Sequence, residues 1–178
     1  LAKDAIAQGF DEVNFDYIRF PSDGRISEAI YTHTDGRSKT EPINSFFAYL
    51  DESLKDEPAY ISADLFGMTL WSKSDFNIGQ TLLGAAPYFD YISPMVYPSH
   101  YADGFQGYSN PAEYPYEIVS QNLMRGTKTL EEASSTAKLR PWLQDFDLGA
   151  DYTPEMVRAQ IRAAEEQGTF GWLLWNAS

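Results

Sequence analysis

The segment EVNFDYIRF, residues 12–20, decides how this chain is expected to fold. Apolar and polar side chains alternate along it, it is rich in Val, Phe, Tyr and Ile, and a proline follows it, so it predicts a β-strand. Residues 1–9 before it have the apolar spacing and the final glycine of an amphipathic helix, and residues 42–56 after it repeat that spacing. The polar stretch between them, residues 21–41, predicts a long loop.

The same unit of strand and helix recurs through the rest of the sequence. Further strands are predicted at residues 59–66, 89–97, 138–146 and 170–175. Further helices are predicted at residues 78–87, 113–125 and 154–167, with a second long loop at residues 98–112. Pro141 argues against a central position for the strand that contains it. Strict alternation of strands and helices predicts a parallel sheet with right-handed crossovers.

The composition limits the class of protein. The 178 residues are 43% hydrophobic and 22% charged, which suits one globular domain over residues 1–178. The net charge of −13 disfavours binding to nucleic acid and to anionic membranes, and no apolar run approaches the roughly 18 residues of a membrane span. Cysteine is absent, which excludes disulfides, zinc–thiolate sites and a cysteine nucleophile. The two histidines are His33 and His100, and no loop has EF-hand spacing, so neither a metal nor a cofactor is expected.

Two α/β architectures fit this pattern, an open doubly wound sheet and part of a (β/α)8 TIM barrel. No glycine-rich phosphate loop follows any predicted strand, which argues against a nucleotide-binding open sheet. Every predicted strand instead ends in polar or aromatic residues, and a barrel builds its active site at the carboxyl ends of its strands. These residues are Asp16 to Arg19, Asp64, Tyr97 with His100, Gln144 with Asp145, and Trp175 with Asn176.

Carboxylates at neighbouring strand ends indicate a type of chemistry. Alternation places Asn14 and Asp16 on one face of the first strand, and Asp64 ends the next strand. Two adjacent carboxylates can drive their pKa values apart, which supplies the acid and the base or nucleophile of glycoside hydrolysis. Asp145 is a third candidate, and the 15% aromatic content is explained either by core packing or by a site that stacks sugars. The alternative is that these acids only cap turns and that Arg19 only forms an ion pair.

Five segments resemble a family of bacterial TIM-barrel glycoside hydrolases that is often described only as a domain of unknown function. They are GFDEVNFDYIRFPSDG (9–24), SADLFGMT (62–69), DYISPMVYPSHY (90–101), LRPWLQDF (139–146) and GWLLWNAS (171–178). The resemblance implies that the segments are the fourth to eighth strands of a barrel, with the first three lying before Leu1. It also implies that Asp16 is the first catalytic candidate and that Asp64 is its partner.

A fainter similarity connects the sequence with the family-eighteen chitinases. It rests on the spaced residues Asp11, Asn14 and Asp16, on the sequence Met-Val-Tyr at residues 95–97, and on Trp175. Ile18 stands where those chitinases carry their catalytic glutamate, so their substrate-assisted mechanism is not expected here.

The expected function is therefore that of a glycoside hydrolase acting on a polysaccharide or oligosaccharide. Asp16 is expected to be the nucleophile or base, Asp64 the general acid/base and Asp145 a stabiliser. Contacts to the sugar are expected from Asn14, Arg19, Tyr97, His100, Trp142, Gln144, Trp175 and Asn176. A non-catalytic carbohydrate-binding barrel and a structural interaction domain stay open as alternatives. A partial barrel has two open edges, which predict an oligomer or a missing N-terminal segment that completes the barrel. A secreted or cell-envelope location is expected, since acidic proteins that act on polysaccharides are often exported.

Overall fold

A computed structural model describes residues 1–32, 34 and 36–176, so that His33, Asp35, Ala177 and Ser178 lie outside the described residues. The strands are β1 (Glu12–Phe15), β2 (Tyr60–Phe66), β3 (Tyr91–Met95), β4 (Lys138–Leu139), β5 (Trp142–Gln144) and β6 (Leu173–Trp175). The α-helices are α1 (Ala2–Ala7), α2 (Thr40–Leu54), α3 (Leu82–Ala85), α4 (Pro115–Glu132) and α5 (Pro154–Glu166). Short 3₁₀ helices cover Ile26–Glu28, Gly67–Leu70, Pro98–His100, Phe105–Gly107 and Pro111–Glu113.

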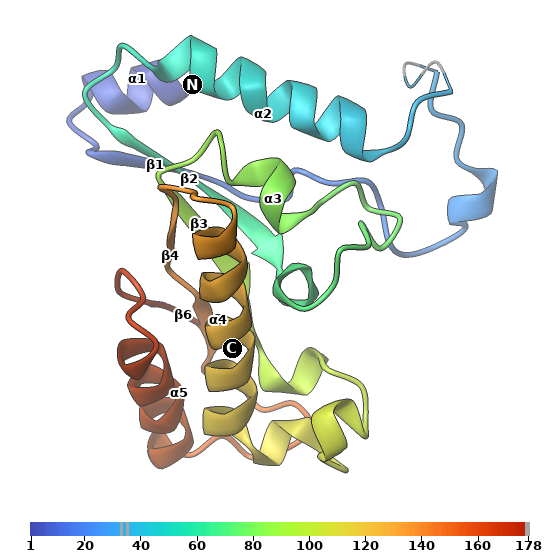
Figure 1. The fold of residues 1–178 in the computed structure, drawn as a ribbon, viewed down its shortest axis with the longest axis vertical. Helices are drawn as coiled ribbons and strands as arrows, with labels where there is room; N and C mark the ends of the chain where they lie inside the picture. The colour runs from blue at the N-terminus through green and yellow to red at the C-terminus, as the bar shows by residue number, and fades with distance from the viewer. Residues whose placement is uncertain (33, 35, 177–178) are drawn as a thin grey trace.

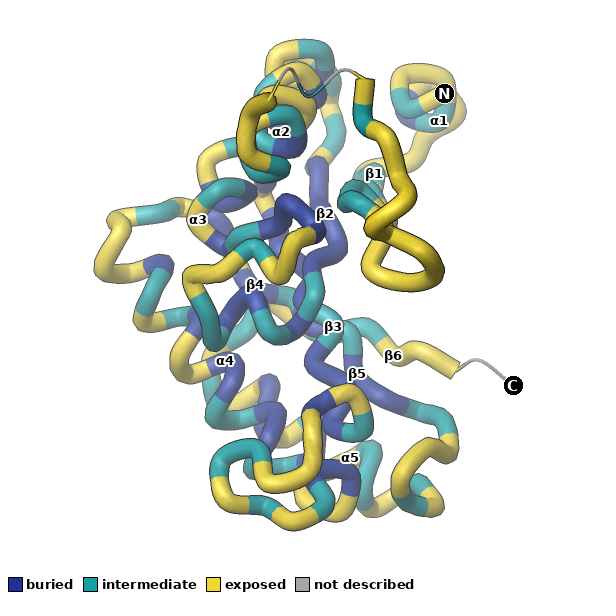
Figure 2. The backbone as a smooth tube through the Cα atoms, turned by 90° about the vertical axis from the view of Figure 1, so that its right-hand side faces the viewer, coloured by how far each residue is buried: buried dark blue, intermediate teal, exposed yellow. Residues whose placement is uncertain are grey.

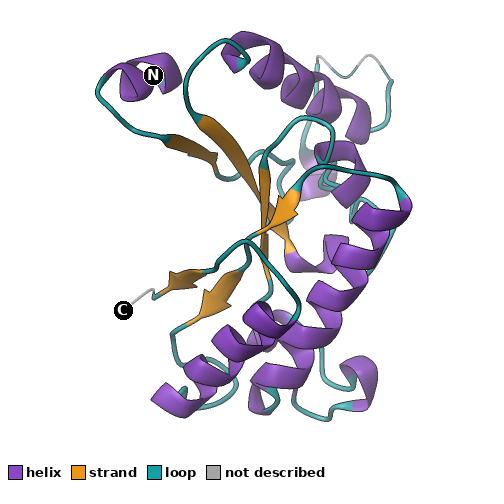
Figure 3. Cartoon of the chain, turned by 60° about the vertical axis from the view of Figure 1, so that its left-hand side comes forward, coloured by secondary structure: helices purple, strands orange, loops and turns teal. Residues whose placement is uncertain are grey.

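All strands are parallel and form one sheet in the order β1-β2-β3-β5-β6, with β4 also pairing to β3. The sheet is strongly curved, and the helices cover its outer face while its inner face carries none of them (Figures 1 and 3). The structure therefore confirms the predicted α/β partial barrel, a half-barrel with its helices outside.

The hydrophobic core lies between the outer face of the sheet and the helices. Ile61, Ala63 and Leu65 of β2 are buried in one cluster with Phe47 and Leu50 of α2. β2 and β3 are almost entirely buried, whereas β1 and β6 at the sheet edges are more exposed (Figure 2). Because side chains alternate along a strand, burying this apolar set turns Ser62 and Asp64 of β2 toward the inner face.

The first strand is shorter than predicted, because β1 ends at Phe15 and not at residue 20. Tyr17 has the left-handed backbone angle φ +63°, which an extended strand does not allow. Beyond this turn the chain leaves β1, and the amide of Phe20 donates to the carbonyl oxygen of Ile78 at 2.8 Å. Asp16 therefore lies just past the strand and not within it, although Asn14 and Asp16 both reach Asp64 as the predicted alternation requires.

Three other boundaries differ from the prediction. Pro141 has no N–H to donate, and it divides the predicted strand 138–146 into β4 and β5. The predicted helix 78–87 is reduced to the four residues of α3. Helix α4 continues past residue 125 to Glu132, and Gly126 does not interrupt it. A side chain at Gly126 would lie 2.8 Å from Leu70, so this glycine allows the helix to approach the core closely.

Among the described residues, none of the helices is both long and apolar enough to cross a membrane.

Candidate active site

A cavity of about 360 Å³ lies at the carboxyl ends of the strands. Its walls combine two carboxylates with a large number of aromatic rings. The lining residues are Asp16, Tyr17, Arg19, Asp64, Phe66, Gly67, Met68, Gln80, Met95, Tyr97, His100, Tyr101, Trp142 and Trp175. Of the residues predicted from the sequence, the fold thus brings together Asp16, Arg19, Asp64, Tyr97, His100, Trp142 and Trp175.

Asp64 is the buried acid of the cavity, with only 5% of its surface exposed. Its Oδ1 atom accepts two hydrogen bonds, from Asn14 Nδ2 at 3.0 Å and from Trp142 Nε1 at 2.8 Å. Burial raises the pKa of Asp64 from 3.8 to about 6, although these two donors act in the opposite direction. The Asp64 carboxyl can therefore carry a proton close to neutral pH, as a general acid must.

Asp16 lies beside Asp64 on the wall of the cavity. The negative charge of Asp16, and a hydrogen bond between the two carboxyl groups, raise the pKa of Asp64 further. The two carboxyl groups thus lie close enough to interact directly, as the paired acids of a glycosidase do. At neutral pH the carboxyl groups of Asp16 and Asp64 can share one proton.

Gln80 links the segment that carries Asp16 to the end of β2, which carries Asp64. It is 1% exposed, and its Oε1 accepts from the amide of Phe66 at 3.1 Å. Its Nε2 donates to the carbonyl oxygens of Ile18 at 3.0 Å and Asp64 at 3.2 Å. One side chain therefore joins the segment that follows β1 to the end of β2, although 62 residues separate Gln80 from Ile18.

Replacing Gln80 with leucine is expected to lower the free energy of unfolding by about 2–4 kcal/mol, since it leaves several buried polar groups without partners. Urea denaturation measures this change. Gln121→Leu is the matched control, because Gln121 makes one long bond of 3.4 Å to the Tyr108 hydroxyl and is only partly buried. Equal losses for the two variants would contradict the role given to Gln80.

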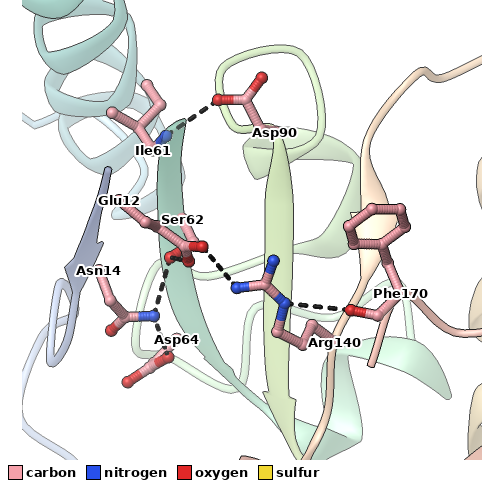
Figure 4. Close-up of polar contacts among 8 residues, drawn as sticks. All are labelled: Glu12, Asn14, Ile61, Ser62, Asp64, Asp90, Arg140 and Phe170. Carbon is pink, nitrogen blue, oxygen red and sulfur yellow. Dashed lines mark hydrogen bonds and ion pairs between the residues drawn. The ribbon is translucent and has the colours of Figure 1, made fainter. Parts of the chain in front are cut away.

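A chain of hydrogen bonds that includes Glu12 and Ser62 holds the side chain of Asn14 (Figure 4). Arg140 of the segment between β4 and β5 bonds to Glu12 Oε2 at 2.5 Å, and Ser62 donates to Glu12 Oε1 at 2.7 Å. Asn14 Nδ2 then donates to Ser62 Oγ at 3.0 Å as well as to Asp64. The amide of Asn14 is therefore held with its N–H group toward Asp64, so Asn14 acts on the site through Asp64 although it does not line the cavity.

Aromatic and cationic side chains form the rim. The Arg19 guanidinium lies 4.1 Å from the ring centre of Tyr17 and 4.8 Å from that of Phe66. Arg19 donates to the Phe20 carbonyl oxygen and to Ser22, so the structure gives it these partners in place of the ion pair considered above. On the opposite side, Trp142 and Trp175 meet edge to face with ring centres 6.1 Å apart.

Tyr97 and His100 complete this wall from the loop that follows β3. Their rings are perpendicular, with centres 5.1 Å apart. Burial raises the pKa of Tyr97, and the charges of Asp64 and Asp16 raise it further. Burial lowers the pKa of His100. Both groups are therefore neutral hydrogen-bonding groups at neutral pH.

Besides Asn14, three predicted site residues lie outside the cavity. Gln144 is fully buried, and its Oε1 accepts from the backbone amide and the hydroxyl of Ser99 at 3.1 and 2.9 Å. It holds the loop that carries Tyr97 and His100 and does not line the cavity, so its predicted contact with substrate is not carried into the proposal below. Asp145 accepts a hydrogen bond from Asn176 at 3.3 Å, and neither residue lines the cavity.

Several cavity residues were not singled out by the sequence. Phe66, Gly67, Gln80 and Tyr101 belong to this group, as does Tyr17, which lay among the predicted strand-end residues but received no role of its own. Four of them lie in the segments that follow β1, β2 and β3, where no periodicity shows which way a side chain points. Trp142 alternates with the fully buried Leu143, and this alternation was the signal that it faces inward. Within the described ranges, no cluster of three or more His, Cys, Asp or Glu residues could hold a metal ion.

A family model described as "Putative glycosyl hydrolase domain" matches residues 1–178. No curated protein sequence matches the chain. Among solved structures, the chain is similar to the PgaB (BpsB) glycoside hydrolase domain from Bordetella bronchiseptica, with TM-score 0.56 and 15% identity over 78% of this chain. It is also similar to 2,3-dimethylmalate lyase, a member of the PEP mutase/isocitrate lyase superfamily, with TM-score 0.54 and 12% identity over 97% of this chain.

The chain spans only 37% and 52% of the lengths of these two solved chains. Their identities with it are low, and one is a hydrolase while the other is a lyase, so the likeness establishes the half-barrel fold alone.

Proposed function

The chain belongs to this family of glycosyl hydrolase domains, and from that premise we propose that it hydrolyses glycosidic bonds in a polysaccharide or oligosaccharide. The observation that carries the proposal is the buried Asp64, whose pKa of about 6 suits a general acid, in contact with Asp16 inside an aromatic cavity. One fold supports many chemistries, so the proposal depends on these side chains and not on the barrel.

Asp64 is the proton donor in this proposal. Its Oδ1 is engaged by Asn14 and Trp142, which leaves Oδ2 to carry the proton. That proton passes to the glycosidic oxygen as the bond from this oxygen to the anomeric carbon breaks. The two N–H donors then stabilise the carboxylate that remains, because hydrogen bonds to a charged acceptor are stronger.

Asp16 is the second carboxylate. It acts as the base that takes a proton from the attacking water, or as the nucleophile that attacks the anomeric carbon. Tyr17, Trp142 and Trp175 offer ring faces to the sugar, and Tyr97, His100 and Arg19 offer polar groups to its hydroxyls. Asp145 has no part in this proposal, since it lies outside the cavity.

The experiment is a reducing-end assay of the purified chain against a panel of soluble polysaccharides, with Asp64→Asn beside it. Hydrolysis that Asp64→Asn abolishes supports the proposal. Binding without hydrolysis would support the non-catalytic carbohydrate-binding barrel instead. If the chain neither binds nor cleaves any member of a broad panel, the hydrolase proposal fails.

The open edges of the half-barrel lead to a proposal about association. Within the described residues, β1 and β6 each pair along one side only. Unpaired parallel strands tend to associate with other strands. The 178-residue chain alone is therefore expected to form oligomers with a mass above 20.1 kDa at high concentration. Light scattering coupled to gel filtration measures this, and Leu174→Lys on β6 should reduce it. A monodisperse monomer at every concentration would contradict the expectation.

A further inference from the structure

Tyr101 places a buried hydroxyl group on the wall of the cavity. The residue is 5% exposed, and it lines the cavity beside Gly67 and Met95. In the part of the chain that the structure describes, its hydroxyl has no hydrogen-bond partner. A buried hydroxyl without a partner destabilises a fold, and phenylalanine would fill the same space without that cost. The stability of the unliganded fold therefore does not explain why a hydroxyl group is present at this position.

The ring of Tyr101 is fixed from behind, so its hydroxyl cannot easily turn toward another partner. Its ring centre lies 4.6 Å from that of Phe105, which in turn lies 5.2 Å from the ring of Trp71. Arg125 of α4 places its guanidinium 4.5 Å from the ring centre of Trp71 and donates to its carbonyl oxygen at 3.1 Å. Two rings and helix α4 thus hold the ring of Tyr101 in place before any ligand arrives.

Gly67 allows the Tyr101 hydroxyl to pack directly against the backbone at the end of β2. A Cβ atom at position 67 would lie 2.6 Å from the Tyr101 hydroxyl and 2.4 Å from the carbonyl oxygen of Met95. Both distances are shorter than any normal contact of a side chain. Gly67, the first residue after β2, therefore has no side chain at the point on the cavity wall where the Tyr101 hydroxyl and the Met95 carbonyl oxygen approach each other.

We propose that Tyr101 is a substrate-binding residue, whose hydroxyl donates a hydrogen bond to an oxygen atom of the sugar chain held in the cavity. This inference rests on the proposed hydrolase function and adds to it a residue that selects the substrate. Burial raises the pKa of Tyr101 well above its usual value, so the phenol stays protonated and acts as a donor. A sugar that lacks an oxygen at this position would leave the donor unpaired and bind less tightly.

The experiment compares Tyr101→Phe with Tyr152→Phe. Tyr152 is the matched control, since it lies outside the cavity and its hydroxyl donates to the carbonyl oxygen of Ala112 at 3.2 Å. The probes are cellohexaose, xylohexaose and chitohexaose, and the readouts are the melting temperature and the hydrolysis kinetics. For Tyr101→Phe we expect an unchanged or higher Tm, a KM raised by about three- to ten-fold and a kcat within about two-fold. For Tyr152→Phe we expect a lower Tm and an unchanged KM.

The opposite pattern would overturn the inference. A lower Tm for Tyr101→Phe with an unchanged KM would make the hydroxyl a structural group. If the unmodified chain hydrolyses none of the three probes, the proposed function fails for these sugars, and titration calorimetry with the same probes decides the role of Tyr101. Weaker binding by Tyr101→Phe than by the unmodified chain then supports the assignment of Tyr101 as a substrate-binding residue. Equal affinity, or no binding by the unmodified chain, overturns it.

Discussion

Asparagine at position 64 is expected to reduce glycosidic bond hydrolysis by about 10²–10⁴-fold, the usual loss when a general acid is removed. The side chain keeps its size, and its oxygen can still accept from Asn14 and Trp142. The cavity should therefore keep its shape and still bind the sugar. A large fall in kcat with a small change in the affinity for the sugar is the expected result.

The same substitution is expected to stabilise the fold at neutral pH. The pKa of Asp64 is raised in the folded chain, from 3.8 to about 6, so the folded state binds the proton more tightly than the unfolded state. The stability that this proton contributes is fully present below pH 3.8 and is lost as the pH rises through about 6. A two-unit shift corresponds to about 3 kcal/mol as an upper limit, and a gain of about 1–2 kcal/mol is expected for Asp64→Asn above pH 7.

Urea denaturation between pH 4 and pH 8 measures this effect. The difference in stability between Asp64→Asn and the unmodified chain should be small at pH 4 and should increase to a plateau above pH 6–7. Asp103→Asn is the control, because Asp103 is an exposed aspartate outside the cavity. Hydrolysis by Asp64→Asn retained within a few-fold would remove Asp64 from the mechanism. An equal gain in the free energy of unfolding at pH 4 and pH 8 would exclude the buried carboxylate as the cause of the stabilisation.

The parts of the fold that follow from local pattern were predictable from the sequence. The helix of residues 154–167 has apolar spacing, proline at its first position and Thr153 before it, and the structure confirms α5 with the Thr153 hydroxyl accepting from the amide of Met156. The strand of residues 59–66 was predicted within one residue. Parallel order then placed Asp16 and Asp64 at neighbouring strand ends, because β1 and β2 pair directly.

Features that depend on distant partners were not predictable. The left-handed turn at Tyr17 follows no residue preference, since tyrosine is disfavoured there. Gln144 satisfies the sequence pattern of a substrate-binding residue, yet its side-chain oxygen accepts from Ser99, 45 residues away, and its NH2 group donates to the carbonyl oxygen of Phe146. The role of Gln80 depends on bonds to three backbone groups on two different segments. Long-range polar contacts of this kind have no signature in a single sequence.

Asparagine at position 16 is expected to reduce hydrolysis by about 10²–10⁴-fold and also to change its pH dependence. The charge of Asp16 and its hydrogen bond to Asp64 both raise the pKa of Asp64. Without the carboxylate at position 16, the pKa of Asp64 should therefore fall. A general acid must be protonated, so the basic limb of the pH–rate profile should move to lower pH for the activity that remains.

Two measurements separate the roles of Asp16. The pH–rate profile of Asp16→Asn reports the catalytic proton, and a ¹³C NMR titration of the Asp64 carboxyl in the same variant reports its pKa directly. Asp145→Asn is the control, because Asp145 also follows a strand but lies outside the cavity, and its rate and profile should stay close to those of the unmodified chain. A rate loss with an unmoved Asp64 titration would make Asp16 a base or nucleophile that does not tune Asp64. A lower Asp64 pKa with nearly full activity would leave Asp16 only the tuning role, and the second carboxylate of the mechanism would then have to come from elsewhere.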